Sequence, residues 1–171
     1  QPISNRTMNN EELFSELVRK YSKPLYWKVR QIVVRHEDAD DVLQNAFMKA
    51  WTKIGDFRGE SNLQTWLYRI CVNEALDFLR KKREMLSNDG EMKMADKQFA
   101  DDYFDGNETQ IKLFKAIETL PEAQRITFTL RYFDELPYAE ISQILGTSEG
   151  GLKANYHLAV KKIKEFFLKN D

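Results

Sequence analysis

The stretch Asp38–Trp51, DADDVLQNAFMKAW, is followed by GDFRGES at 55–61 and by TWLYRI at 65–70. Apolar residues recur every three or four positions in the first segment, which predicts an amphipathic helix over 38–54. Glycines and polar residues then predict a loop. The helical pattern resumes over 62–83, with Ser61 or Asn62 as the N-cap. This helix is expected to bury Leu63, Leu67, Ile70, Cys71 and Phe78 and to leave Gln64, Tyr68, Arg69, Asn73, Asp77 and Arg80 more exposed. An acidic and amide-rich helix face, a polar loop and an aromatic-basic helix therefore follow one another closely.

Helical periodicity continues on both sides of this stretch. The N-terminal side predicts a helix over 10–35 that Pro24 bends or breaks. In the C-terminal half, Pro121 and Pro137 suit first helical positions and Gly146 suits a helix stop. The helices expected there cover residues 109–119, 122–133, 138–145 and 148–168.

The two halves are separated by a change in composition. Residues 87–108 hold seven acidic residues against two lysines, a local net charge of −5, and show no sustained apolar period. This composition predicts a flexible acidic linker, although its aromatic residues could dock on a domain. We therefore predict an all-α protein of two small helical domains. Its expected parts are a tail at 1–9, a first domain at 10–84, a linker at 85–108 and a second domain at 109–171.

Composition excludes several classes of function. The net charge of −1 gives no bulk signal for nucleic acid, so any DNA binding has to come from local clusters. Cys71 is the only cysteine and there are two histidines, which leaves no disulfide and no four-ligand zinc site. We expect no metal, no cofactor, no small-molecule substrate and no enzyme activity. With no apolar run near membrane-spanning length and no signal peptide, the sequence predicts a reducing cytoplasm.

Residues 137–164 have the pattern of a helix-turn-helix, with a turn at Gly146. The second helix has short residues near the N-terminus of its outward face and cationic or hydrogen-bonding residues beyond them. Such a face can enter a major groove and reach bases or phosphates; the alternative is a solvated helix. The candidate residues are Gly150, Lys153, Ala154, Asn155, His157, Leu158 and Lys161.

A second candidate surface lies on the 38–54 helix. Asp41, Gln44, Asn45 and Met48 lie about one turn apart, on the side opposite the apolar stripe. An acid with two amides suits docking to a basic helix, and the alternative is ordinary solvation.

These motifs together resemble the bacterial sigma factors, in particular the small extracytoplasmic-function (ECF) group. The resemblance includes LPEAQR at 120–125, RYF at 131–133 and LPYAEISQILG at 136–146, in addition to the 38–70 stretch. It covers about residues 10–84 and 109–168. Two features depart from the family pattern. Arginine is common in the family where this chain has Asn155, Leu158 and Val160, which weakens the expected phosphate contacts. An acid is common where it has Asn45.

The resemblance implies an alternative sigma factor that binds core RNA polymerase and directs promoter recognition, DNA melting and transcription initiation. Asp41, Gln44, Asn45 and Met48 would contact the clamp coiled coil of the polymerase largest subunit, and the polymerase flap is a further expected contact. The 148–168 helix would read the minus-thirty-five element. The loop and helix after residue 56 would capture a flipped minus-ten base, through Phe57, Arg58, Gly59, Glu60, Ser61, Asn62, Arg69, Asn73 and Arg80.

The family also implies an anti-sigma factor as a partner, which could hold the chain at the inner membrane. Two rival functions remain open at this stage. A stand-alone helix-turn-helix regulator would account for residues 137–164 but not for 38–84, and a helical adaptor would bind only proteins. Only a sigma factor requires tight binding to core RNA polymerase.

Overall fold

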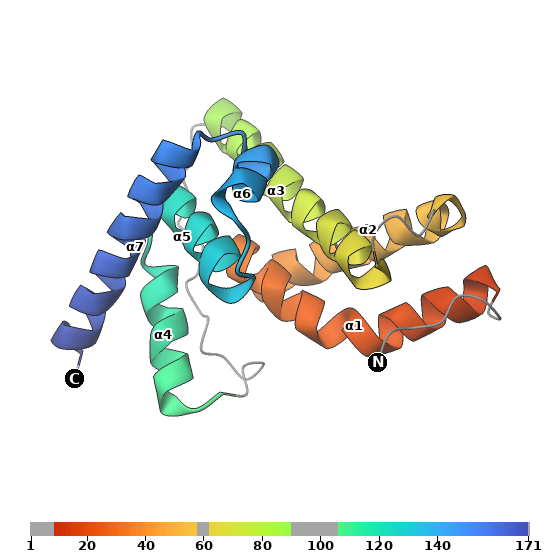
Figure 1. Cartoon of the computed structure of the whole chain (residues 1–171), viewed down its shortest axis with the longest axis horizontal. Coiled ribbons are helices and arrows are strands. Elements are labelled where there is room, and N and C mark those ends of the chain that lie inside the picture. Colours follow the sequence, from red (N-terminus) through yellow and green to blue (C-terminus); the bar gives the residue numbers. More distant parts are fainter. Residues whose placement is uncertain (1–8, 58–61, 90–105, 171) are drawn as a thin grey trace. The chain divides into compact units, whose positions relative to one another are not determined.

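The computed structural model describes residues 9–57, 62–89 and 106–170, with only the backbone at 87–89. Every regular element within these ranges is helical (Figure 1). The chain divides into two compact units, Gln1–Met94 and Ala95–Asp171, and each is described by itself. The predicted all-α fold with two helical domains is confirmed, while most of the predicted linker lies outside the described residues. No described helix is long and apolar enough to cross a membrane.

In its described parts, residues 9–57 and 62–89, the first unit is an arrangement of three long helices. It consists of α1 (Asn10–Val33), α2 (His36–Lys53), a short 3-10 turn η1 (Ile54–Asp56) and α3 (Leu63–Asp89), and each long helix packs on the other two. The α1 helix continues through Pro24, because residues on both sides of it are buried against the same core. The α3 helix extends six residues beyond the expected end at 83, so residues 85–89, assigned to the linker from sequence, are helical.

Small side chains let α2 approach its neighbours closely. Ala39, Ala46 and Ala50 of α2 and Ala75 of α3 are all fully buried. Trp51 was expected in the buried stripe of α2, but it is 45% exposed and packs on Phe14 with the ring centroids 5.2 Å apart. Its position follows from size, since an indole does not fit where the helices meet at alanines.

The buried stripe of α3 follows every fourth residue rather than the predicted set. Leu63, Leu67 and Cys71 are buried as expected, whereas Ile70 and Phe78 are only half-buried. The buried positions beyond Cys71 are Val72, Ala75 and Leu79. The helix therefore turns Asn73 and Arg80 outward, as the sequence predicted.

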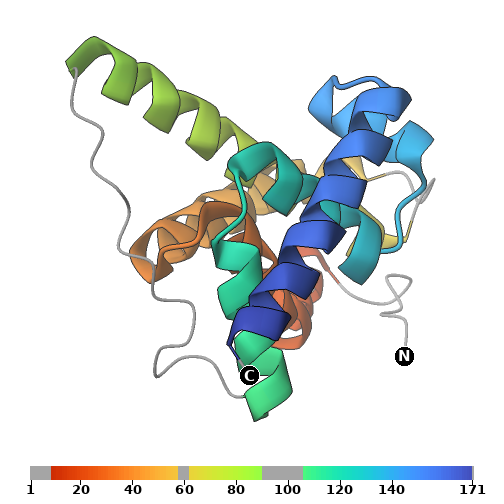
Figure 2. The same ribbon diagram turned by 90° about the vertical axis from the view of Figure 1, so that its left-hand side faces the viewer.

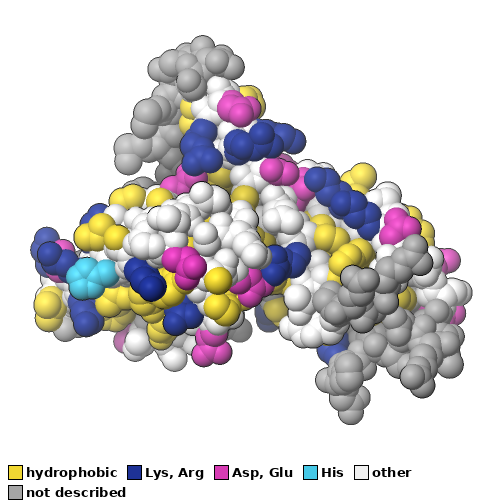
Figure 3. Space-filling view, turned by 45° about the horizontal axis from the view of Figure 1, so that its top comes forward, with side chains coloured by type: hydrophobic (Ala, Val, Ile, Leu, Met, Phe, Trp, Pro, Cys, Tyr) yellow, Lys and Arg dark blue, Asp and Glu magenta, His cyan; other side chains and the backbone are white. Residues whose placement is uncertain are grey.

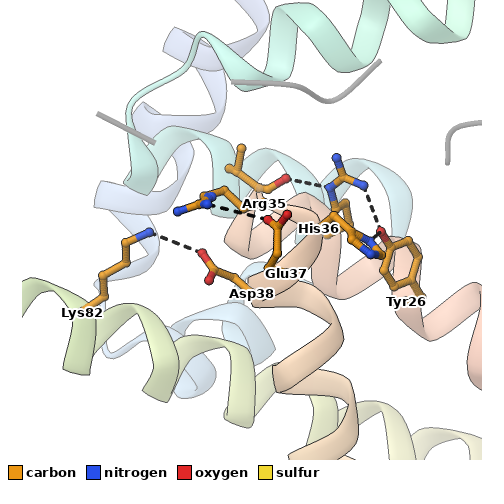
Figure 4. Close-up of polar contacts among 8 residues, drawn as sticks. Tyr26, Arg35, His36, Glu37, Asp38 and Lys82 are labelled. Carbon is orange, nitrogen blue, oxygen red and sulfur yellow. Dashed lines mark hydrogen bonds and ion pairs between the residues drawn. The ribbon is translucent and has the colours of Figure 1, made fainter. Parts of the chain in front are cut away.

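A buried arginine organises the turn between α1 and α2. Arg30 is 1% exposed; its Nε donates to the Val34 carbonyl at 2.7 Å and its Nη1 to the Tyr26 hydroxyl at 2.9 Å. Val34 lies at φ 80°, a left-handed conformation that is strained for a β-branched residue. Figure 4 shows Tyr26 and His36 facing each other, with the Tyr26 hydroxyl 2.6 Å from His36 Nδ1. Because the guanidinium can only donate, the Tyr26 hydroxyl accepts a hydrogen bond from Arg30 and can donate one to His36.

Over residues 106–170, the second unit contains four helices and one π-helical turn. These are α4 (Glu108–Glu118), α5 (Glu122–Phe128), the π-turn η2 (Thr129–Phe133), α6 (Tyr138–Leu145) and α7 (Glu149–Lys169). Pro121 and Pro137 occupy N-cap positions, one residue before the first helical positions predicted for them. Gly146 ends α6 at φ 71°, where glycine is favoured, and the Ser148 side chain caps α7 as predicted.

Aromatic and small residues form the core of the second unit. Both views of the chain show α4 alongside α7 (Figures 1 and 2), and the two helices are in contact. The ring of Phe128 lies between those of Tyr132 and Tyr156, stacked at centroid distances of 5.0 and 5.7 Å. The buried core cluster consists of Ala116, Ile117, Leu120, Phe128, Ala159 and Ile163.

Two ionisable residues are buried where α4 meets α5. Arg125 and Glu118 are each 8% exposed. Burial lowers the pKa of Arg125, and the charges of Glu122 and Glu118 oppose this shift. The sequence predicts one helix over 122–133, but from Thr129 onward the structure has the π-turn η2 instead. After this turn, the Leu136 N–H donates to the Leu130 carbonyl at 3.2 Å.

We expect Arg30→Met to lower the free energy of unfolding of the first unit by about 2–3 kcal/mol, because it leaves buried acceptors of Val34 and Tyr26 without their donor. All three tryptophans of the chain, Trp27, Trp51 and Trp66, belong to this unit. Urea unfolding followed by tryptophan fluorescence therefore reports on it selectively. Arg19→Met, which removes an exposed ion pair with Glu16, should cost less than about 0.5 kcal/mol. Equal losses in both variants would contradict a special role for Arg30.

Candidate nucleic-acid and polymerase interfaces

The outer face of α2 presents the four residues predicted to dock a protein. Asp41, Gln44, Asn45 and Met48 are all exposed, Met48 by 67%. Their helix buries the opposite side, so the four side chains are free to meet another surface. Gln44 Nε2 donates to Asp40 at 3.0 Å, which orients the amide along the helix. One acid, two amides and one thioether give a face that combines charge, hydrogen-bonding groups and apolar area.

The start of α3 is held by Asn62. Its Oδ1 accepts from the Thr65 backbone N–H at 2.7 Å, so Asn62, rather than Ser61, supplies this cap hydrogen bond. Phe57 and Trp66 are both half-buried and contact each other, with the ring centroids 5.6 Å apart. The Phe57 ring therefore packs on the first turn of α3. Four of the predicted minus-ten residues, Arg58, Gly59, Glu60 and Ser61, lie outside the described residues.

Further along α3, Asn73, Asp77 and Arg80 follow one another at one-turn intervals. Asn73 and Arg80 are exposed, and Arg80 donates to Asp77 at 3.2 Å. Arg69, the remaining predicted residue on this helix, is half-buried. The helix thus offers an amide and a guanidinium outward, with carboxylates beside them.

Two ion pairs between α2 and α3 were missed from the sequence. Lys49 Nζ lies 2.5 Å from Glu74 Oε2, and Lys82 Nζ lies 3.4 Å from Asp38 Oδ2. The second pair is drawn in Figure 4. Hydrogen bonding to Glu74 raises the pKa of Lys49, with a further contribution from the charge of Asp77. The partners are 25 and 44 residues apart, so no local spacing signals them.

Cys71 lies on the buried side of α3. Burial, together with the nearby charge of Glu74, raises the pKa of its thiol to about 12. A thiol that stays neutral and fully enclosed packs as a small apolar side chain. Among the described residues no cluster of three or more His, Cys, Asp or Glu side chains is arranged to hold a metal ion.

The recognition face predicted on α7 points outward. Leu152, Ala159 and Ile163 are buried on its other side. Leu158 is 41% exposed and is therefore available for an apolar contact with a ligand. Of the candidate residues Asn155 alone is half-buried; the exposed ones are Gly150, Lys153, Ala154, His157, Leu158 and Lys161.

The ring of Tyr138, at the start of α6, gathers two cations. The Arg131 guanidinium lies 4.7 Å from its centroid and Lys153 Nζ lies 5.8 Å away. Arg131 is also tied to the Leu136 carbonyl by a 2.9 Å hydrogen bond. The sequence pattern indicates Lys153 but not this cluster, because the cluster's members come from three separate elements.

Charge is locally balanced rather than segregated. Figure 3 shows Lys and Arg side chains beside Asp and Glu side chains over much of the described surface in that view. This agrees with the net charge of −1. Contacts to a polyanion therefore depend on individual exposed faces and not on a broad basic surface.

Comparisons with known proteins define the class. Residues 17–85 match the family model Sigma-70 region 2, and residues 110–163 match Sigma-70, region 4. The chain is 33% identical to the ECF RNA polymerase sigma-E factor of Escherichia coli (strain K12), over 90% of this chain and 86% of that protein. It is 30% identical to the RNA polymerase sigma-H factor of Pseudomonas aeruginosa, over 95% and 90%.

A solved structure agrees with these matches. The sigma factor RpoE from Bartonella quintana, crystallised with the anti-sigma factor NepR, resembles this chain with a TM-score of 0.68 and 27% identity. The match covers 92% of this chain and 98% of that one. CnrH, solved in complex with the cytosolic domain of CnrY, shares the fold with a TM-score of 0.59 and 20% identity.

One family model in each unit places the protein in the class of sigma-70-type transcription initiation factors. Within that class, the chain belongs to the ECF RNA polymerase sigma factors. It is an alternative sigma factor that directs promoter recognition and transcription initiation, and its partners are core RNA polymerase and promoter DNA. The rival functions of a stand-alone regulator and an adaptor are thereby excluded.

Proposed function

We propose that three exposed helix faces divide the work of this sigma factor. The α2 face, formed by Asp41, Gln44, Asn45 and Met48, docks on the clamp coiled coil of core RNA polymerase. The α3 face reads the minus-ten element and supports strand separation, and the α7 face reads the minus-thirty-five element. The observation that carries this assignment is that each of these helices buries one side in its own unit and leaves most of the predicted contact residues that the structure describes exposed on the other.

The α7 face is suited to selective contact deep in a major groove. Gly150 and Ala154 add little bulk near the helix N-terminus, while Lys153 and His157 extend outward from the same side. Tyr138 holds Lys153 near the surface through a cation–π contact. With Asn155 half-buried and Leu158 apolar, the face has few cations, so its affinity for phosphate alone should be low.

The α3 face is suited to a base that has left the stack. Asn73 is exposed and offers both a hydrogen-bond donor and an acceptor, the combination that a base edge requires. Arg80 follows it and is exposed for contact with a phosphate. Phe57 and Trp66, packed together at the start of the helix, offer partly exposed rings near the loop. Strand separation would then be driven by trapping the unpaired base.

The chain would act without a catalytic step, leaving RNA synthesis to the polymerase, which would also provide most of the DNA affinity. We place it in the cytoplasm, where an anti-sigma factor at the inner membrane would sequester it. The structure of the relative bound to NepR supports an anti-sigma partner for this chain. Such a partner would mask the α2 face and the DNA-reading faces.

The docking face is tested by Asp41→Lys combined with Gln44→Ala. Charge reversal against a basic coiled coil should weaken binding to core RNA polymerase by about tenfold or more, while circular dichroism stays unchanged. Fluorescence anisotropy of the labelled chain titrated with core enzyme measures this. Glu165→Lys, an exposed change in the second unit with the same shift in net charge, is the matched control. Unchanged affinity in the double variant would count against the α2 face.

The minus-ten assignment is tested by Asn73→Ala. The variant should lose about 1–3 kcal/mol of discrimination at one minus-ten position, the amount expected for one lost base contact. Run-off transcription with core enzyme on a promoter library measures preference at every position at once. Core binding and upstream preference should persist. A uniform loss over all promoter variants would assign Asn73 to structure instead.

The anti-sigma proposal is tested by competition. The anti-sigma factor, this chain and core RNA polymerase are mixed in equal amounts. An anti-sigma factor that binds this chain should prevent the chain from associating with core RNA polymerase. Size-exclusion chromatography of the mixture separates the possible complexes. A ternary complex containing core enzyme, this chain and the inhibitor would show that the α2 face is not masked.

A further inference from the structure

The DNA-reading side of α3 carries two carboxylates close to its reading residues. Glu74 directly follows Asn73, and Asp77 lies one turn beyond it, before Arg80. Promoter DNA has a phosphate at every nucleotide, and charges act over a Debye length of about 8 Å at physiological ionic strength. Two uncompensated carboxylates at this place would repel the strand whose base Asn73 contacts.

The neighbouring helix supplies a cation at this position. Lys49 of α2 places its Nζ 2.5 Å from Glu74 Oε2. The Glu74 side chain is only 13% exposed in this pair, against 50% for Lys49. The contact therefore holds the carboxylate toward α2 and away from the outer side of α3.

The second carboxylate is balanced by a residue with a competing task. Arg80 donates to Asp77 at 3.2 Å, but its side chain is 57% exposed and belongs to the proposed DNA contacts. When Arg80 turns to a phosphate, Asp77 loses this partner. The charge of Asp77 contributes to the raised pKa of Lys49, so these two charges also attract each other.

We propose that Lys49 is a positioning residue for minus-ten reading: it neutralises Glu74 and holds this carboxylate clear of the strand that Asn73 reads. Because Lys49 directly follows Met48 of the docking face, the same helix segment binds polymerase and prepares the DNA face. This inference depends on the proposed role of α3 at the minus-ten element.

Two simpler roles for Lys49 predict different results. An ion pair that only stabilises the fold contributes about 0–1 kcal/mol to the free energy of unfolding. In that case, replacing Lys49 and replacing Glu74 should lower the free energy of unfolding by the same amount. A lysine that itself binds a phosphate would be released by removing Glu74. In the proposed role, by contrast, removing Glu74 makes Lys49 less necessary.

A double-mutant cycle distinguishes these roles. The variants are Lys49→Met, Glu74→Gln and both together, each as the full chain bound to core RNA polymerase. The probe is a fluorescein-labelled single strand carrying the minus-ten element of a promoter found by run-off transcription. Lys49→Arg tests rescue by a second cation, and Lys53→Met removes one exposed charge a turn further along α2. Urea unfolding by tryptophan fluorescence accompanies every variant.

We expect Lys49→Met to raise the dissociation constant for the strand by about three- to fivefold, the size of one uncompensated charge near a phosphate. Glu74→Gln should bind at least as tightly as the wild type. Three variants should have dissociation constants within about twofold of the wild-type value: the double variant, Lys49→Arg and Lys53→Met. The inference is overturned if Lys49→Met binds normally, if the double variant stays as weak as Lys49→Met, or if Glu74→Gln is equally weakened.

The Asn73→Ala measurement separates this inference from the proposed function. If Asn73→Ala relaxes one base preference while the cycle shows no coupling, only the role of Lys49 fails. If Asn73→Ala changes no base preference, the assignment of α3 to the minus-ten element fails.

Discussion

The buried Arg30 guanidinium sets the direction in which α2 leaves α1. It donates to the carbonyl of Val34, whose left-handed backbone is unfavourable for a β-branched residue, and to Tyr26, which faces His36 at the first turn of α2. A strained two-residue turn persists only where surrounding contacts compensate for it. With that turn in place, α2 buries its alanines and presents the docking face outward. The α2 face proposed to bind polymerase therefore depends on an interaction at the start of that helix.

Local charge balance governs how the two units can contact DNA. A chain with a net charge of −1 gains little from long-range attraction to phosphates. Its carboxylates next to the reading residues are paired with cations, by Lys49 at Glu74 and by Arg80 at Asp77. Such an arrangement favours selective contacts made after the polymerase has brought the promoter close. It is also compatible with the few cations on the α7 face, because in the proposed function the polymerase provides most of the DNA affinity.

The second unit has few arginines, and stacked aromatic rings hold its helices and two of its cations in place. The π-turn after α5 and the stacked rings of Tyr132, Phe128 and Tyr156 support the start of α6 and the inner side of α7. Tyr138 then holds Arg131 and Lys153 on one ring. Cations held in this way lose less conformational freedom when they meet a phosphate. Rigid placement can therefore offset part of the affinity that additional arginines would supply.

The amino-acid sequence alone determined the helical class, the division into two domains, the Gly146 turn and which sides of α2 and α7 face outward. These features follow from local periodicity and from residue-specific backbone preferences, which are visible within a few turns of helix. The tertiary structure decided where bulky residues meet small ones, which left Trp51 partly exposed and moved the buried stripe of α3 to Val72, Ala75 and Leu79. It also decided the pairing of Lys49 with Glu74 and the burial of Arg30. Contacts between separate helices depend on how those helices pack against each other, and no spacing within a single helix encodes that geometry.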